Sequence, residues 1–232
     1  TEGELAAAVA ELGVPVIAKT ARFGYDGKGQ ARITDPADVA AVWEALGGER
    51  LVVESVIVFE RELSVVVARG VDGDVVDHGV MENTHANHIL DTTTVPARVP
   101  DATAEAARAT ARLVATGLGL VGVLCVELFD TAEGILVNEI APRPHNSGHC
   151  TIEAAAASQV EQQLRAVTGQ PLGDGSCAPA AMAQLLGDLW DDGEPDWTAA
   201  LARPGVHLHR YGQREARTGL KRPPLTVGGD DA

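Results

Sequence analysis

The sequence has few aromatic side chains, few cysteines and a shortage of positive charge. Aromatic residues make up 3% of its 232 residues, and 18 Lys and Arg stand against 33 Asp and Glu, giving a formal net charge of -15. A balance this negative excludes nucleic-acid backbones and anionic membrane surfaces as main partners. The three cysteines are too few for a disulfide framework and too far apart for a metal knuckle. No apolar stretch approaches the length of a membrane span, and the first residues do not resemble a signal peptide.

What the chain does contain is enough apolar sequence for a core, since 45% of its residues are hydrophobic. The composition predicts a soluble, cytoplasmic α/β protein that acts on small molecules. The chain lacks an initiator Met, and a helical stretch at 4–12 leads at once into a strand, so we expect it to be part of a longer protein. Basic residues gather at 203–222, which indicates either a site for an anionic ligand or a solvated edge strand.

Hydrophobic periodicity and turn signals predict strands and helices along the whole chain. The dipeptide Asp72-Gly73 between apolar runs indicates a hairpin, and a second hairpin follows around Asp130 to Glu133. The expected strands are residues 14–19, 31–33, 51–54, 62–69, 75–80, 121–129, 134–140, 180–186, 206–211 and 224–228. The expected helices are residues 4–12, 35–46, 102–118 and 158–167, with another near Trp197. We place the main break of the chain near residue 80, between a small α/β lobe and a larger one.

The first candidate site is a glycine-rich loop directly after Lys19. It reads Phe23-Gly24-Tyr25-Asp26-Gly27-Lys28-Gly29-Gln30. Closely spaced glycines let backbone N–H groups approach an anion, and Lys28 adds charge, although the spacing is not that of a P-loop. The loop by itself could be an ordinary hairpin. Lys19 favours a flexible cover over phosphates, because a charge that ends a buried strand needs a partner.

The second candidate site is a pair of carboxylates, Glu127 and Glu139, on the two strands of the second hairpin. Each is in phase with apolar neighbours, which makes two solvated glutamates the less favoured interpretation. If Asp130 pairs with Gly134, Glu127 opposes Val137 and lies diagonal to Glu139 on the same face. Two neighbouring carboxylates repel unless a cation or proton lies between them. Oxygen ligands of this kind suit Mg²⁺ that bridges substrate phosphates.

The third candidate site is the run from Asn138 to His149, Asn-Glu-Ile-Ala-Pro-Arg-Pro-His-Asn-Ser-Gly-His. Two prolines stiffen this loop, so that Arg143, His145 and Asn146 can be held in place. A guanidinium beside a metal-binding carboxylate suits a small planar oxyanion through bidentate bonding. Neither histidine has a spacing typical of zinc, and no Ser or Cys is placed as a nucleophile with a base.

A fourth candidate is the stretch between Glu54 and Glu62, an acid at the end of a buried strand followed by apolar residues. Such a stretch could hold a nucleotide, with apolar groups around the adenine and a carboxylate on the ribose hydroxyls. A plain strand-loop-strand connection would have the same spacing.

These residues together resemble the ATP-grasp enzymes and, more narrowly, the 5-(carboxyamino)imidazole ribonucleotide synthetases, the ATPase subunits of phosphoribosylaminoimidazole carboxylase in purine synthesis. The match covers nearly the whole chain, and the run from Asn138 to His149 is highly specific. The other matching segments are Gly24 to Gln30, Glu62-Leu63-Ser64, Glu82-Asn83-x-His85, Ser158-Gln159-x-Glu161, Leu164-Arg165-Ala166 and His209-x-Tyr211-Gly212.

The resemblance implies an α/β (α+β) ATP-grasp fold with a small α/β lobe at 1–80, a larger antiparallel-sheet lobe with the metal site at 81–175, and a β-rich subdomain at 176–232. It implies a ligase that uses ATP and Mg²⁺ to activate bicarbonate as carboxyphosphate and so carboxylates aminoimidazole ribonucleotide. It also implies a homodimer with small-molecule substrates and no nucleic-acid or membrane partner.

The resemblance also implies a role for each candidate residue. In the nucleotide site, Lys19 and Lys28 would hold ATP phosphates, and the covering loop would consist of Gly24, Tyr25, Asp26, Gly27, Gly29 and Gln30. The adenine hinge would consist of Glu54, Ser55, Val56 and Ile57. Glu62 would bind the ribose, and His85 would line the site. In the metal and acceptor sites, Glu127 and Glu139 would bind Mg²⁺ with Asn138 beside them, and Arg143, His145 and Asn146 would receive bicarbonate.

Two departures from the family pattern leave alternatives open. The family's N-terminal Rossmann-like domain is absent from this sequence, and Gln213 and Leu220 stand where the family has basic residues at the acceptor site. The alternatives are a related ATP-grasp ligase, such as a formate-using glycinamide ribonucleotide transformylase, and a nucleotide-binding fragment or paralogue without turnover.

Overall fold

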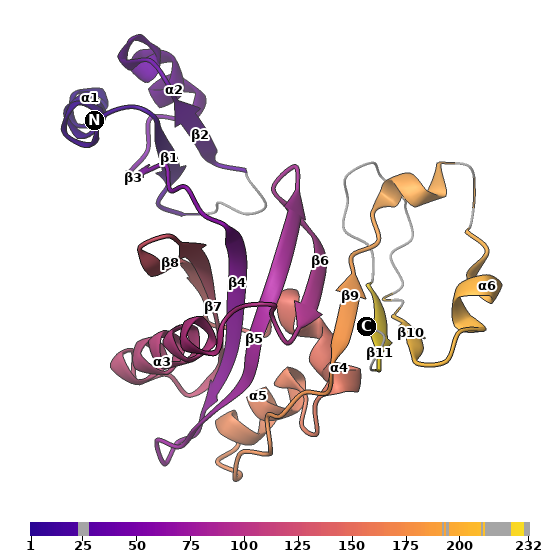
Figure 1. The fold of residues 1–232 in the computed structure, drawn as a ribbon. Coiled ribbons are helices and arrows are strands. Elements are labelled where there is room, and N and C mark those ends of the chain that lie inside the picture. Colours follow the sequence, from indigo (N-terminus) through magenta and orange to yellow (C-terminus); the bar gives the residue numbers. More distant parts are fainter. Residues whose placement is uncertain (23–27, 192, 194, 210, 212–223, 230–232) are drawn as a thin grey trace. The chain divides into compact units, whose positions relative to one another are not determined.

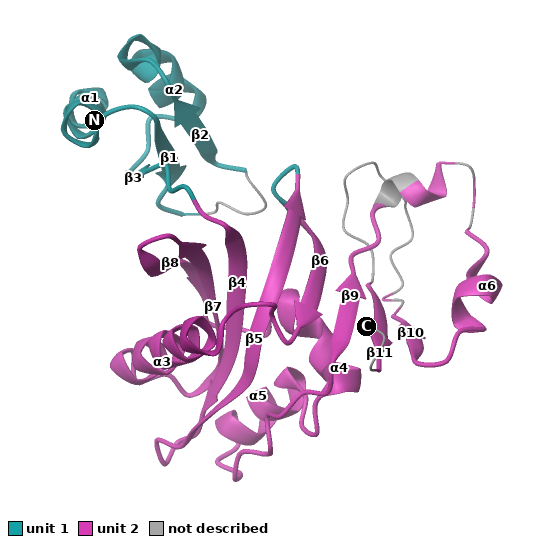
Figure 2. Cartoon of the chain, viewed as in Figure 1, with its two compact units in different colours: residues 1–58, 87–89 teal, residues 59–86, 90–232 magenta. Residues whose placement is uncertain are grey.

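The computed structural model describes the chain except for residues 23–27, 192, 194, 210, 212–223 and 230–232. It divides into two compact units, residues 1–58 with 87–89 and residues 59–86 with 90–232 (Figure 2). The boundary at Val58 therefore comes earlier than the expected break near residue 80. In the described part of the chain, no helix combines the length and apolar character that a membrane crossing requires.

The first unit is a three-stranded antiparallel sheet with strand order β2-β1-β3, packed against helices (Figure 1). Its elements are α1 (Glu2–Leu12), β1 (Val16–Thr20), β2 (Gln30–Ile33), the 3₁₀ helix η1 (Pro36–Asp38), α2 (Val39–Ala45) and β3 (Leu51–Ser55). Helix α1 begins with a capping box: the backbone N–H of Glu4 donates to the hydroxyl oxygen of Thr1, and the carboxylate of Glu4 accepts from the backbone nitrogen of Thr1. Leu5 and Val9 of this helix pack on Val16 and Ala18 of the central strand.

The second unit is built on an eight-stranded sheet with strand order β10-β11-β9-β6-β5-β4-β7-β8. Its strands are β4 (Arg61–Arg69), β5 (Val75–Ala86), β6 (Ile89–Val95), β7 (Gly122–Thr131), β8 (Gly134–Ala141), β9 (Ala180–Ala183), β10 (Val206–Leu208) and β11 (Leu225–Gly228). Its helices are α3 (Asp101–Gly117), η2 (Ser147–Cys150), α4 (Thr151–Ala154), α5 (Gln159–Val167), η3 (Gly187–Trp190) and α6 (Trp197–Leu201).

Both faces of the central strands are covered, which explains why β4 is a nearly continuous apolar run. Leu63, Val65 and Val67 face the alanine stripe of α3. The residues between them, including Val66, face the opposite side, where η2, α4 and α5 lie (Figure 1). Ser64 is on this second face, next to the buried apolar residues Val66 and Ala68. The second face therefore carries the polar site described below.

Two features of the second unit differ from the sequence expectations. Strand β5 runs on to Ala86 and is followed by β6, which the sequence analysis does not predict; Asn87 and His88, both at positive φ, make the turn between them. The strands expected in a C-terminal subdomain at 176–232 instead extend the same sheet, because β9 pairs with β6. The remaining expected elements that fall on described residues are present, with ends shifted by a few positions.

Candidate functional site

Glu127 on β7 lies directly opposite Glu139 on β8, and this corrects the expected diagonal arrangement. The turn pairs Thr131 with Gly134, where the sequence analysis assumed that Asp130 pairs with Gly134. One extra residue, Asn138, then forms a bulge that restores the two glutamates to one face. Directly paired residues have Cβ atoms about 4.5–5.5 Å apart, so the two residues are closer than in the expected diagonal arrangement.

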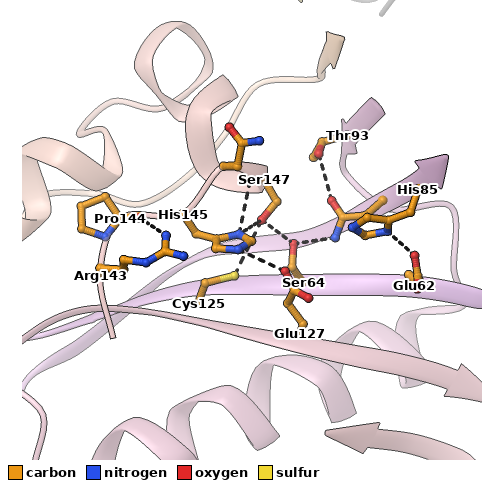
Figure 3. Close-up of polar contacts among 12 residues, drawn as sticks. Glu62, Ser64, His85, Thr93, Cys125, Glu127, Arg143, Pro144, His145 and Ser147 are labelled. Carbon is orange, nitrogen blue, oxygen red and sulfur yellow. Dashed lines mark hydrogen bonds and ion pairs between the residues drawn. The ribbon is translucent and has the colours of Figure 1, made fainter. Parts of the chain in front are cut away.

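The carboxylate of Glu127 is held by the loop that follows β8. His145 Nε2 lies 3.1 Å from Glu127 Oε1, and both side chains are largely buried, with 12% and 17% of their surface exposed. On the other side of the ring, His145 Nδ1 lies 3.0 Å from the hydroxyl of Ser147 and 3.3 Å from its backbone N–H (Figure 3). Both ring nitrogens of His145 therefore have a defined partner.

The backbone of His145 is held by Gln159, the first residue of α5, whose side chain is buried. Its Oε1 accepts the His145 N–H at 2.9 Å, and its Nε2 donates to the His145 carbonyl at 2.7 Å. Gly148 makes room for this contact, since a Cβ there would lie 2.6 Å from Gln159 Oε1 and 2.9 Å from Val66 Cγ2. The loop is thus positioned by a buried amide in addition to its two prolines.

The two other residues expected to receive bicarbonate lie on the same loop. Arg143 is exposed, and its guanidinium donates to the carbonyl of Pro144 at 3.0 Å (Figure 3). Asn146 donates through Nδ2 to Oε1 of Gln184 at 2.8 Å. The loop therefore presents one exposed guanidinium and two side chains that are partly buried and oriented by hydrogen bonds.

Glu62 on β4 and His85 on β5 also come together. His85 Nδ1 contacts Glu62 Oε2, and about a quarter of each side chain is exposed (Figure 3). The sequence analysis assigns both residues to the nucleotide site on the resemblance. The strand pairing brings them together, because Glu62 is opposite Asn83, two residues before His85.

In the first unit, Lys19 on β1 forms an ion pair with Glu54 on β3, with Nζ and Oε2 2.6 Å apart. The partner that Lys19 was expected to need is therefore an acid of the neighbouring strand. Ser55 ends β3, and Val56 and Ile57 follow it as half-buried residues.

The described part of the glycine-rich loop is its second half. Thr20 donates its N–H to the carbonyl of Gly29 at 2.7 Å, and Gln30 pairs with Lys19 in the sheet. Lys28 is exposed. The residues Gly24, Tyr25, Asp26 and Gly27, as well as Gln213, Leu220 and most of the basic stretch at 203–222, lie outside the described residues.

The two glutamates suit a magnesium ion that binds together with a nucleotide. They suit less well a metal that is held by protein side chains alone. Among the residues with described positions, no group of three or more His, Cys, Asp or Glu could hold a metal. Mg²⁺ in phosphate-binding sites commonly takes one or two carboxylates, with waters and substrate phosphates as its other ligands. The paired carboxylates of Glu127 and Glu139 match that requirement, and Asn138 is beside them on the bulge.

The three cysteines are free thiols, and none has the character of a nucleophile. Burial, followed by the nearby charge of Glu127, raises the pKa of Cys125 far above its usual range. Burial likewise raises the pKa of Cys150 to about 12 and that of Cys177 to about 11. A thiol in this state carries almost no thiolate at neutral pH.

Four residues that hold the site were given no role by the sequence analysis: Ser64, Asn83, Ser147 and Gln159. The available signal was a polar residue in phase with apolar ones, as with Ser64 before Val66 and Ala68. That signal shows that a polar group faces the core, but only the packing of η2 and α5 on the sheet shows what it contacts.

Comparisons with known proteins identify the family of the chain. Residues 1–160 match the ATP-grasp domain family. The N5-carboxyaminoimidazole ribonucleotide synthase of Bacillus subtilis is 42% identical over 228 residues, which cover 97% of this chain and 59% of that protein. A crystal structure of the ADP complex of an N5-carboxyaminoimidazole ribonucleotide synthetase has a TM-score of 0.89 and 39% identity, over 99% of this chain and 61% of that one.

A third similar protein is the synthase from Aspergillus clavatus, solved in complex with ADP and 5-aminoimidazole ribonucleotide. It has a TM-score of 0.84 and 30% identity, again over 99% of this chain and 61% of that one. The chain therefore spans about 60% of the length of these relatives. The expected fold is confirmed: the chain belongs to the ATP-grasp family, and within it the chain is a homologue of the N5-carboxyaminoimidazole ribonucleotide synthases.

Proposed function

We propose that the protein containing this chain carboxylates 5-aminoimidazole ribonucleotide in an ATP- and bicarbonate-dependent reaction of purine synthesis. The observation that carries this proposal is the loop from Arg143 to Ser147, which presents an oriented His145 to one of two paired carboxylates. Similarity to the synthases over nearly the whole chain supports the same reaction. We place this reaction in the cytoplasm and in a homodimer, as the resemblance implies.

ATP is the proposed source of the transferred phosphoryl group. Lys19 and Lys28 would neutralise its phosphates, under the glycine-rich loop from Gly24 to Gln30. Glu54 to Ile57 would hold the adenine, and Glu62, oriented by His85, would accept hydrogen bonds from the ribose. The Lys19–Glu54 ion pair supports these roles, because it places the ammonium group of Lys19 next to the first residue of the hinge.

Glu127 and Glu139 would hold Mg²⁺, assisted by Asn138. Bound there, the ion would offset the charge of the phosphates during transfer. The pairing of two carboxylates supports this role, because like charges directly opposite on a sheet are destabilising without a cation. A carboxylate has two oxygens, so the contact with His145 does not by itself prevent Glu127 from binding a cation.

Arg143, His145 and Asn146 would bind bicarbonate. A bicarbonate oxygen attacks the γ-phosphorus of ATP, the bond from that phosphorus to the β,γ-bridging oxygen breaks, and carboxyphosphate and ADP result. Carboxyphosphate then releases CO₂ and phosphate. The exocyclic amine of the ribonucleotide attacks CO₂ and loses a proton, which gives the N-carboxy product. The exposed guanidinium of Arg143 supports this assignment, since it can pair with a planar oxyanion.

The test is an assay of the complete encoded protein with Mg·ATP, aminoimidazole ribonucleotide and ¹³C-bicarbonate. We expect ADP release that depends on both co-substrates and ¹³C in the carbamate product by NMR. ADP release with formate and glycinamide ribonucleotide instead would indicate the related transformylase activity. Binding of ATP without turnover under any acceptor would indicate a nucleotide-binding paralogue. Either of these results would overturn the proposal.

A further inference from the structure

Helix α5 of the second unit has its polar and apolar faces reversed. Gln159 and Gln162 are buried against the sheet, with 3% and 0% of their surface exposed. Three apolar residues on the other side are exposed: Val160 at 46%, Leu164 at 60% and Val167 at 50%. A surface helix normally turns its apolar stripe to the core and its polar face to solvent. The reversal indicates that the two faces of α5 have different tasks.

The inner face of α5 uses side-chain amides to hold the backbone of other segments. Gln162 Nε2 donates to the carbonyl of Gly173 at 2.8 Å, and its Oε1 accepts the N–H of the same residue at 2.9 Å. Gln163 Oε1 accepts the N–H of Val123 at 2.7 Å, and Gln159 holds the loop of the candidate site as described above. The buried amides therefore find their hydrogen-bond partners within the chain.

The outer stripe of α5 consists of Val160, Leu164 and Val167. These residues follow one another at intervals of four and three, the spacing of a helix that packs against another helix. Val71, in the turn between β4 and β5, is 63% exposed and continues the apolar surface past the end of α5, since a Cβ on Gly169 would lie 3.8 Å from Val71 Cγ2. Contiguous exposed apolar surface of this kind marks an interaction site.

The sequence around the outer stripe is almost uncharged. Between Ala154 and Gly173 it holds one acid, Glu161, and one base, Arg165, in a chain with a formal net charge of -15. Arg165 Nε and Nη2 lie 2.9 and 2.6 Å from Glu161 Oε1, so the two charges offset each other. Two copies of so acidic a chain repel each other over most of their surface. A neutral apolar patch is where they can come together, because the centres of protein interfaces are depleted of charge.

The spacing of the outer stripe is also nearly symmetric about Leu164, with one valine four residues before it and another three residues after it. A two-fold axis brings the same surface of two subunits together, so the surface must be complementary to itself. With the axis beside Leu164, the two leucines would contact each other, and Val160 of one copy would face Val167 of the other. The outer stripe therefore fits a second copy of itself.

We propose that the outer stripe of α5 is the apolar centre of a two-fold interface between two copies of this protein, with the axis beside Leu164. The helix is nine residues long, so polar surface around it would complete an interface of the usual size. The interface would form the homodimer of the proposed function, on which this assignment rests. The same helix would then contact the partner with its outer face and hold the candidate site with its inner face.

Association of the complete encoded protein, measured by analytical ultracentrifugation over a range of concentrations, tests the interface. Leu164→Lys would bring two like charges together at the axis and should raise the dissociation constant of the dimer by about 10-fold or more. The introduced ammonium group can pair with Glu161 within the helix, so folding should be retained. Leu113→Lys is the matched control, because Leu113 is 73% exposed on α3, which covers the opposite face of the sheet, and it should leave the dissociation constant unchanged. If Leu164→Lys does not fold, Val167→Lys decides.

A cross-linking experiment tests the place of the axis. Leu164→Cys should form a disulfide between two subunits under oxidation with diamide, because a disulfide joins Cα atoms within about 7 Å of each other and the axis would bring the two thiols together. Leu113→Cys should form no such disulfide, and the wild type controls for the native thiols. Gel electrophoresis without reductant separates the cross-linked dimer from the monomer.

Three results would overturn the inference: a wild type that stays monomeric, a Leu164→Lys variant that dimerises as tightly as the wild type, or a Leu164→Cys variant without a cross-link. Carboxylation by a monomer would overturn the interface and support the proposed reaction. A dimer that responds as expected in a protein that carboxylates nothing would do the reverse. The two failures are therefore distinguishable, since association is measured without any substrate.

Discussion

Glu127 and Glu139 face each other across neighbouring antiparallel strands, with His145 contacting the first of them. Two acidic side chains in direct opposition destabilise a sheet by a few tenths of a kcal/mol to about 1 kcal/mol unless something of positive charge lies between them. If the pair holds Mg²⁺ as proposed, removal of one carboxylate should have opposite effects on stability and on ligand binding.

The Glu139→Gln variant tests this connection. We expect the melting temperature of the protein without ligand to rise slightly, because the repulsion is removed. Stabilisation by Mg·ATP should become weaker, and activity should fall by about 10-fold or more, as when an electrostatic contact to a reacting phosphate is lost. Differential scanning fluorimetry with and without Mg·ATP measures both effects. Glu133→Gln, an exposed acid in the turn of the same hairpin, is the control and should show neither effect.

Lys19 forms its ion pair with Glu54, the first of the residues proposed as the adenine hinge. If Lys19 also holds phosphate, Lys19→Met should weaken ATP binding by about 10-fold or more, since a hydrogen bond to a charged group contributes about 1.5–3 kcal/mol. Isothermal titration calorimetry measures this change. Arg32→Met removes an exposed positive charge from the same sheet and should leave the affinity unchanged. Equal affinities in the two variants would exclude Lys19 from the phosphate site.

Gly148 should not tolerate a side chain, because a Cβ there would meet the amide of Gln159 that holds the backbone of His145. We expect Gly148→Ala to destabilise the protein by about 1–3 kcal/mol, the usual cost of overpacking, and to lower carboxylation more than ATP binding. Gly117→Ala is the control, since it has open space around it at the end of α3 and should be neutral or slightly stabilising. Urea denaturation compares the two variants.

Asp77 is buried on β5 and accepts hydrogen bonds from Arg108 and Arg112 of α3 and from the N–H of Gly79. Burial alone would raise its pKa, but these hydrogen bonds outweigh burial, and the net pKa is lowered. We expect Asp77→Asn to cost about 1.5–3 kcal/mol, because it weakens the charged hydrogen bonds to two arginines that are themselves partly exposed. A loss below about 1 kcal/mol in urea denaturation would contradict this prediction.

The pH dependence of this contribution follows from the direction of the pKa shift of Asp77. A carboxyl whose pKa is lowered in the folded state contributes its full stabilisation when the pH is above its pKa in the unfolded state, about 3.9. The contribution is lost as the pH falls through the folded value. The free energy of unfolding of the wild type should therefore decrease more steeply below about pH 4 than that of Asp77→Asn.

His149 introduces a second pH dependence, in a higher range. Burial, followed by the proximity of His209, lowers the pKa of His149 to about 4. A histidine in the unfolded chain has a pKa of about 6.5, so between about pH 4 and that value the unfolded state binds more protons than the folded state. Stability should therefore fall as the pH drops from about 6.5 to about 4. His149→Gln should flatten this part of the curve in thermal denaturation, and an unchanged slope would contradict the assignment.

Much of the fold could be predicted from the sequence, because it depends on local patterns. The Asp72-Gly73 turn, the alanine-rich α3 and the paired runs of β7 and β8 follow from turn chemistry and periodicity. Strand β6 was not predicted, because its turn is Asn87-His88 without a glycine. The extent of the large sheet was also not predicted, since the pairing of β9 with β6 joins residues far apart in sequence.

The sequence by itself determined which residues are the candidates for the chemistry: Lys19, Glu127, Glu139 and the loop from Arg143 to Asn146, each conspicuous as a polar group in an apolar or proline-rich setting. Only the tertiary structure decided their partners. A one-residue bulge at Asn138 set Glu127 opposite Glu139, and the packing of η2 on β4 brought Ser147 to Ser64. Register and long-range contact depend on how whole elements pack, and no local pattern in the sequence encodes them.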